Sequence, residues 1–207
     1  MTIAEIVAPL KDVVLGGAAI VGAVVAWRGL KTWKRQLKGG VEYELARRLL
    51  RCTYKYRDAL SWVRHPMMLA SEMPLPPEEN RARMNQEEIR HYGSGAGYQA
   101  RWNGVTTARN NLQAEILEAE VLWGASARAT FAPLYKLQHE LFGAIYLYLR
   151  SMDPKLSEQS RHSLSESLAK KRDIVFDLSG PEPDEFVVDL NSAVNKIEEF
   201  VKPHLEQ

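Results

Sequence analysis

The pattern of apolar and polar residues changes character along the chain. No charged or strongly polar side chain occurs from Val13 to Trp27. Beyond residue 40, apolar residues recur every three to four positions, as they do on one face of an α-helix. The first pattern is typical of a helix in lipid or in a deep core, and the second is typical of helices that pack side by side.

The uncharged stretch predicts an N-terminal transmembrane helix. Its fifteen residues make about 22 Å of helix, and a usual span needs roughly twenty residues. The apolar residues 6–10 extend the stretch at its start. Trp27 and Trp33 are expected to lie at its other end as anchors at the membrane interface. A buried helix of a soluble protein and a cleavable signal peptide are the alternatives. A signal peptide should have bases ahead of its apolar run, where this chain has Glu5 and Asp12.

The charges after this stretch predict an orientation. Five bases and no acid follow it, namely Arg28, Lys31, Lys34, Arg35 and Lys38. Bases stay on the cytoplasmic side, so we expect a single-pass protein of the inner membrane with its N-terminus outside. The same bases are expected to contact anionic lipid headgroups. The alternative is that they simply lie on the solvent-exposed face of a helix.

Small residues recur inside the same stretch. Ala18, Gly22 and Ala26 lie four positions apart, so they share one helix face. Such a face allows two helices to approach closely. It predicts packing of transmembrane helices and hence a homo-oligomer.

The remainder of the chain predicts a cytoplasmic helical bundle. Gly39-Gly40 is expected to stop the first helix, which divides the chain into residues 1–38 and 39–207. A flexible glycine-rich connection is expected at 93–97, and a β-hairpin at 174–188 stays open as an alternative to helix. Helices are expected over 41–64, 78–92, 98–123, 128–152, about 164–178, and 183–202. The predicted fold class is all-α, a transmembrane helix followed by a bundle.

Composition and charge narrow the function classes. The formal net charge is +1, so no general attraction to nucleic acid is expected. Bases concentrate in the front of the chain and acids in the rear, which suggests a contact between the two, within or between subunits. The single cysteine, Cys52, excludes an internal disulfide and a cysteine-based zinc site, and it is expected to be a small buried apolar residue.

The sequence contains no recognisable catalytic pattern. Neither a GxxxxGK[ST] phosphate loop nor a GxSxG nucleophile turn occurs. Glu87 and His91 lie one helical turn apart without further ligands nearby, and His139 lies on another segment. Glu115 and Glu118 lack the Glu-x-x-His partners of a di-metal bundle. We therefore expect no catalytic residue, no cofactor and no metal site.

The runs TWKRQLKG at 32–39 and YELARRLL at 43–50 resemble a stretch found in small, uncharacterised bacterial membrane-anchored helical proteins. The resemblance covers the first third of the chain. It implies a bacterial source and the same topology, and it implies no activity.

These observations predict a membrane-tethered, non-enzymatic interaction or scaffold module that self-associates or binds a protein partner. One alternative is an oligomerising effector that perturbs membranes, such as a bacterial defence component. The other is an enzyme whose site is assembled from scattered residues such as Glu87, His91 and His139.

Overall fold

The computed structural model describes the backbone of residues 3–178 and 184–206, and the side chains of those from residue 21 onward. All regular structure in these ranges is helical. The α-helices are α1 (Ile3–Val63), α2 (Glu78–Arg81), α3 (Gln86–Trp123), α4 (Ser126–Ser151), α5 (Glu158–Ala169) and α6 (Glu185–Val201), and the 3₁₀ turns are η1 (Ala70–Glu72) and η2 (Lys202–His204).

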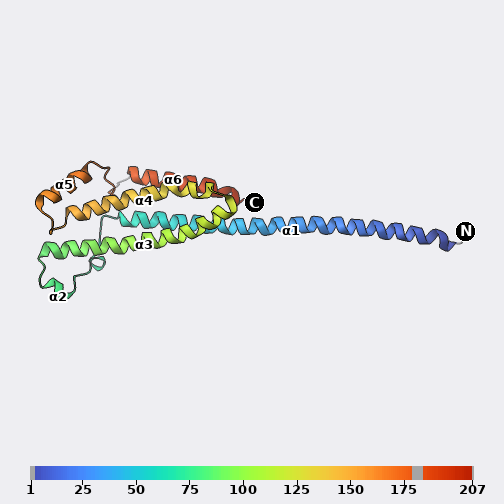
Figure 1. Ribbon diagram of the computed structural model, residues 1–207, viewed down its shortest axis with the longest axis horizontal. Coiled ribbons are helices and arrows are strands. Elements are labelled where there is room, and N and C mark those ends of the chain that lie inside the picture. Colours follow the sequence, from blue (N-terminus) through green and yellow to red (C-terminus); the bar gives the residue numbers. More distant parts are fainter. Residues whose placement is uncertain (1–2, 179–183, 207) are drawn as a thin grey trace.

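The second half of α1 forms a four-helix bundle with α3, α4 and α6 (Figure 1). Successive helices run in opposite directions, and α6 closes the bundle by packing against both α4 and α1. The short helix α5 packs on α4 at the end of the bundle away from the C-terminus. The first half of α1 extends from the other end as a single long helix.

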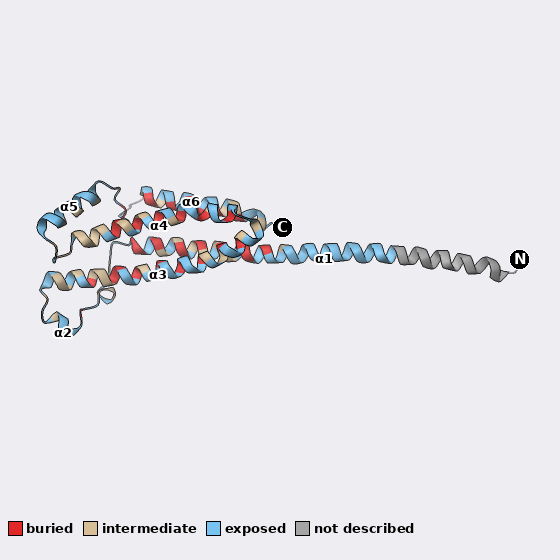
Figure 2. Cartoon of the chain, viewed as in Figure 1, coloured by how far each residue is buried: buried red, intermediate tan, exposed pale blue. Residues whose placement is uncertain are grey.

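The core of the bundle follows the predicted helical stripes. On α1 it takes Leu45, Leu49, Tyr56 and Leu60, and on the facing α3 it takes Val105, Leu112 and Ile116. All seven are fully buried, and Figure 2 shows that the described part of α1 is exposed until the helix enters the bundle. The predicted all-α bundle is confirmed, since packing of these apolar faces is what stabilises such helices.

The predicted transmembrane helix is wrong. Among the residues that the structure describes, none of the helices combines the length and the apolar character that crossing a membrane requires. The uncharged run itself has only fifteen residues, with Asp12 before it and Arg28 after it, whereas a usual span needs roughly twenty apolar residues. The single-pass topology, the inner-membrane location and the outside N-terminus are corrected with it.

The two helix breaks predicted at glycine-rich sites, at Gly39-Gly40 and at 93–97, are also wrong. Gly39 and Gly40 lie inside α1, where the ion pair of Lys38 with Glu42, one turn on, spans them at 3.5 Å. The glycines from 93 to 97 lie inside α3. A Cβ on Gly93 would lie 3.3 Å from Met73. The absence of a side chain at Gly93 therefore allows Met73 to pack closely against the helix. Tertiary packing offsets the low helix propensity of glycine, about 1 kcal/mol per residue.

Other helix boundaries differ from the pattern. The helix expected over 78–92 is instead the short α2 and the start of α3, where Asn85 accepts a hydrogen bond from the Glu88 backbone N–H and caps the helix. The alternative hairpin is excluded, because 186–188 lie in α6. The helices predicted over 128–152 and 183–202 are confirmed within two residues as α4 and α6.

Candidate interaction surface

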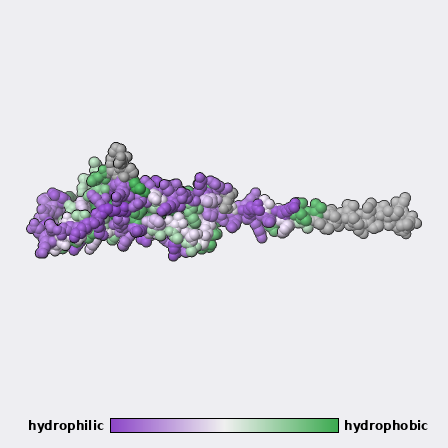
Figure 3. Space-filling model, turned by 90° about the horizontal axis from the view of Figure 1, so that it is seen from above, coloured by the Kyte–Doolittle hydropathy of each residue, from purple (hydrophilic) through white to green (hydrophobic). Residues whose placement is uncertain are grey.

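The part of α1 ahead of the bundle is a solvent-exposed helix, and we call its residues 21–41 the arm. Its apolar side chains contact no other element, and Trp27, Leu30, Trp33, Leu37 and Val41 are each about half exposed or more. Figure 3 shows apolar atoms on the arm beside the grey segment and hydrophilic atoms between them and the bundle. The arm is thus an amphipathic helix whose apolar side has no partner within the described chain.

Four apolar side chains of the arm follow a heptad spacing. Ala26, Leu30, Trp33 and Leu37 are separated by four, three and four residues, the alternation of a and d positions in a coiled coil. At a helical repeat of 3.6 residues these positions form one stripe. The arrangement can therefore bury its apolar side against another helix that runs along it.

The five predicted basic residues lie on the arm beside this stripe. All five are exposed, and Lys38 forms an ion pair with Glu42. Arg28, Lys31, Lys34 and Arg35 have no ion pair within the described part of the chain. In heptad terms Lys34 lies at an e position and the others lie at b or f, away from the centre of the apolar stripe.

Headgroup contact by the five bases and interface anchoring by Trp27 and Trp33 stay predictions. The structure shows that these side chains are exposed. Of the small-residue face, Gly22 and Ala26 are exposed, while the side chain of Ala18 lies outside the described residues. Self-association of this helix stays a prediction.

The arm joins the bundle at a polar junction. Glu42 is 4% exposed, and its carboxylate lies 3.3 Å from Nδ1 of His204 in η2. The His204 ring stacks on Trp123 with centroids 3.9 Å apart. Two turns further, Arg48 donates hydrogen bonds to Glu115 at 2.9 Å and to Glu118 at 2.6 Å, which raises the pKa of Arg48. These contacts fix the direction in which the arm leaves the bundle.

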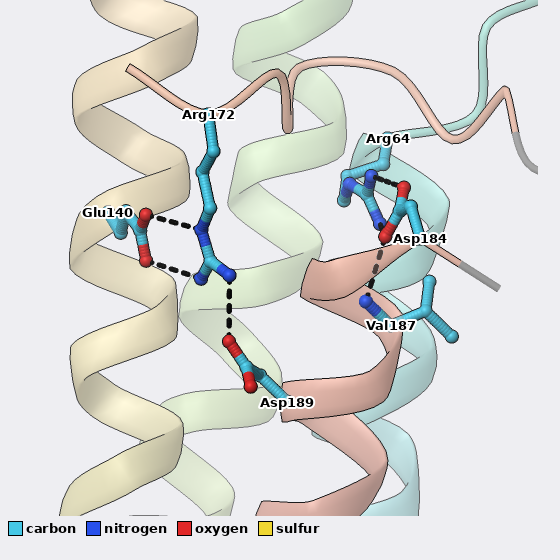
Figure 4. Close-up of polar contacts among 6 residues, drawn as sticks. All are labelled: Arg64, Glu140, Arg172, Asp184, Val187 and Asp189. Carbon is cyan, nitrogen blue, oxygen red and sulfur yellow. Dashed lines mark hydrogen bonds and ion pairs between the residues drawn. The ribbon is translucent and has the colours of Figure 1, made fainter.

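Two arginines hold the segment before α6 against the bundle (Figure 4). Arg64 is buried, donates to the carbonyl oxygens of Ile174 at 2.7 Å and Phe176 at 3.1 Å, and forms an ion pair with Asp184. Arg64 also lowers the pKa of Asp184, against the opposing effect of burial.

Arg172 is the second arginine that holds this segment, and we call Arg64 and Arg172, with their partners, the two arginine clamps. It donates to the carboxylates of Glu140 on α4 at 2.7 and 2.8 Å and of Asp189 on α6 at 2.7 Å. Its pKa is raised, mainly by the hydrogen bond with Glu140. Periodicity does not identify either clamp, because the partners lie on distant segments of the sequence.

The residues weighed for chemistry remain scattered. No three histidine, cysteine, aspartate or glutamate side chains gather for a metal within the described ranges. Glu115 and Glu118 bind Arg48, and His139 is exposed on α4. Cys52 packs partly buried against the core, and burial raises the pKa of its thiol. Glu87 and His91 line the same hollow, which has a volume of about 280 Å³.

Comparison of the chain with protein-family models, with curated proteins and with solved structures finds no match. The arm and the bundle therefore carry the functional argument by themselves.

Proposed function

We propose that this chain is a non-enzymatic interaction module that forms a parallel pair with a second copy of itself through the arm. The observation that carries the proposal is the exposed heptad stripe of Ala26, Leu30, Trp33 and Leu37 on a helix fixed at its root. Contiguous exposed apolar surface of this kind marks interaction sites in soluble chains. The bundle then serves as a folded base that projects the arm.

The spacing favours a second copy as the occupant of this stripe. In a parallel two-stranded coiled coil each a or d residue packs beside its own counterpart, so one self-complementary stripe is sufficient. Leu30 and Leu37 at a and Trp33 at d would then meet Leu30, Leu37 and Trp33 of the second copy. Fully burying a leucine side chain contributes about 1.5–3 kcal/mol.

The positions of the charges fit the same pairing. In a parallel pair, position g of one helix faces position e of the other. Lys34 at e would face Gly29 of the second copy, and Val41 at e would face Gln36. No base opposes a base at these positions, so the basic side of the arm does not prevent the pairing.

Analytical ultracentrifugation of the full chain tests this function. The wild-type chain should sediment as a dimer. The double variant Leu30→Glu/Leu37→Glu should weaken self-association at least about a hundredfold, since it places four carboxylates in an apolar seam. Thr32→Glu adds the same charge at a c position outside the seam, so it is the matched control and should still dimerise. A monomeric wild type, or equal association of all three proteins, would contradict the proposal.

A further inference from the structure

Two hollows share Leu149 of α4 in their linings, and each also takes residues of α3. The first has a volume of about 280 Å³, and we call it the cationic hollow. The second has a volume of about 180 Å³, and we call it the aromatic hollow. Because Leu149 lines both, and Ser94 of the first is followed by Gly95 of the second, the two hollows adjoin. We treat them together as one groove, of the size that takes a small molecule.

The cationic hollow is rich in hydrogen-bond donors. Its polar lining consists of Glu87, Arg90, His91, Ser94, Ser151 and Arg161. Arg90 and Arg161 form no ion pair within the described residues, so two cations face one carboxylate. Planar guanidinium groups donate two parallel hydrogen bonds to an oxyanion, which makes arginine the usual residue for binding carboxylates and phosphates.

Two nitrogen atoms at this hollow lack partners. Nδ1 of His91 and Nε of Arg161 are shielded from solvent and make no hydrogen bond within the described chain. An unsatisfied buried polar group costs about 1–3 kcal/mol. A bound anion would relieve that cost, either directly or by drawing the two side chains into the hollow.

The aromatic hollow adjoins the cationic hollow. Trp102 and Phe142 face each other there with ring centroids 5.0 Å apart, and the partly exposed Tyr146 borders them. Gly95 belongs to the wall, and a Cβ built on it would meet nothing within 4 Å. Flat aromatic walls suit an apolar ring system, which gains both burial and favourable ring contacts.

We propose that this groove binds a small amphipathic anion. Its oxyanion head lies between Arg90 and Arg161, and its flat apolar body lies against Trp102 and Phe142. The site lies at the end of the bundle away from the arm, so it is independent of the pairing proposed above. Carboxylate and phosphate heads share the chemistry that these arginines recognise.

Binding of 8-anilinonaphthalene-1-sulfonate to the full chain, followed by fluorescence titration, tests the site. The probe joins an anionic head to an aromatic body. Arg90→Gln/Arg161→Gln should weaken its binding about tenfold or more, since two charge-assisted contacts are lost. Phe142→Ala should weaken it as well. Arg47→Gln changes an exposed arginine on α1 and is the matched control, and it should bind as the wild type does.

The uncharged analogue N-phenyl-1-naphthylamine separates this site from general apolar binding, including binding to the arm. Its affinity should be unchanged by Arg90→Gln/Arg161→Gln and lowered by Phe142→Ala. Benzoate and phenyl phosphate, added as competitors, then distinguish a carboxylate head from a phosphate head, and displacement by either supports the site. The proposal would be overturned if Arg90→Gln/Arg161→Gln bound the sulfonate as tightly as the wild type does, with an unchanged unfolding midpoint. It would also be overturned if neither benzoate nor phenyl phosphate displaced the sulfonate.

Discussion

Buried arginines decide much of this fold at the scale of single residues. Arg64 and Arg101 are 1% and 3% exposed, yet each is surrounded by acceptors. Arg101 donates to the Glu72 carboxylate at 2.8 Å and to the carbonyl oxygens of His65 and Met67, both at 2.7 Å. A buried guanidinium is tolerated only when such partners replace water. These two side chains thereby fix irregular segments that have little apolar surface of their own.

Replacing Arg64 by methionine should destabilise the protein by about 2–4 kcal/mol. The change removes the guanidinium that donates to the carbonyls of Ile174 and Phe176 and that pairs with the carboxylate of Asp184. Arg57→Met is the control, because the contacts of Arg57 within the described residues are local ones on the same helix, with the exposed Asp58 and the ring of Tyr54, and it should cost less than about 1 kcal/mol. Urea unfolding followed by circular dichroism measures both, and equal small losses would contradict the clamp.

The carboxylate of Glu72 should make stability depend on acid pH. The hydrogen bond from Arg101 lowers the pKa of Glu72 from 4.5 to about 2. Because the folded pKa is the lower one, the stabilisation is fully present above the unfolded pKa and is lost as the pH falls from about 4.5 to about 2.

The control for this titration is Glu72→Gln, which cannot ionise. The free energy of unfolding of the wild type should exceed that of the variant by a constant amount above about pH 5, and the difference should shrink below it. Urea unfolding at a series of pH values measures this difference. A difference that stays the same down to about pH 2 would show that the ion pair does not contribute.

The burial of an individual side chain was predictable from sequence only where the local pattern of apolar residues determines it. Cys52, expected on an apolar face, does pack against the core. Arg64 offered no comparable signal, because its partners Ile174 and Asp184 follow it by 110 and 120 residues. Only the folded arrangement brings them together.

At the scale of helices, glycine is where pattern and structure disagree most. Gly97 lies deep in the packing between α3 and the loop before it. A Cβ at this position would collide with Sδ of Met68 and lie 3.0 Å from the Glu72 carbonyl oxygen. Gly95, two residues earlier in the same helix, has nothing within 4 Å.

Alanine at these two positions should therefore have opposite effects. Gly97→Ala should destabilise the protein by about 1–3 kcal/mol, the usual cost of overpacking. Gly95→Ala should stabilise it by up to about 1 kcal/mol, because alanine is the better helix former and its methyl group is free here. Thermal unfolding of the two variants beside the wild type measures the difference. Destabilisation by both changes would mean that space at Gly97 is not the reason for its glycine.

The apolar stripes predicted the long helices well, whereas the breaks between them were misjudged. The stripe residues Val105, Leu112 and Ile116 of α3 are all buried. Local composition at 93–97 could not show that Met68 and Met73 pack onto the helix there. The capping pair Asn85 and Glu88 was the one local signal for the start of α3.

At the scale of the whole molecule, the chain combines a closed bundle with an arm that has no partner within it. The all-α bundle was predictable, because wide apolar faces at helical spacing leave few other arrangements. The uncharged run at 13–27 led instead to a transmembrane helix. No helix among the described residues is long and apolar enough to support one, and the run itself is shorter than the roughly twenty residues that a usual span needs.

Disulfide crosslinking through the arm shows whether two copies pair along the exposed stripe. In a Cys52→Ser background, Leu30→Cys places one thiol at an a position and Thr32→Cys places one at a c position. In a parallel pair the two a-position residues lie close enough for a disulfide, and the c positions face away from each other. Mild oxidation should therefore convert the Leu30→Cys protein, but not the Thr32→Cys protein, to a covalent dimer. Equal crosslinking at both positions, or none at either, would contradict the proposed pairing.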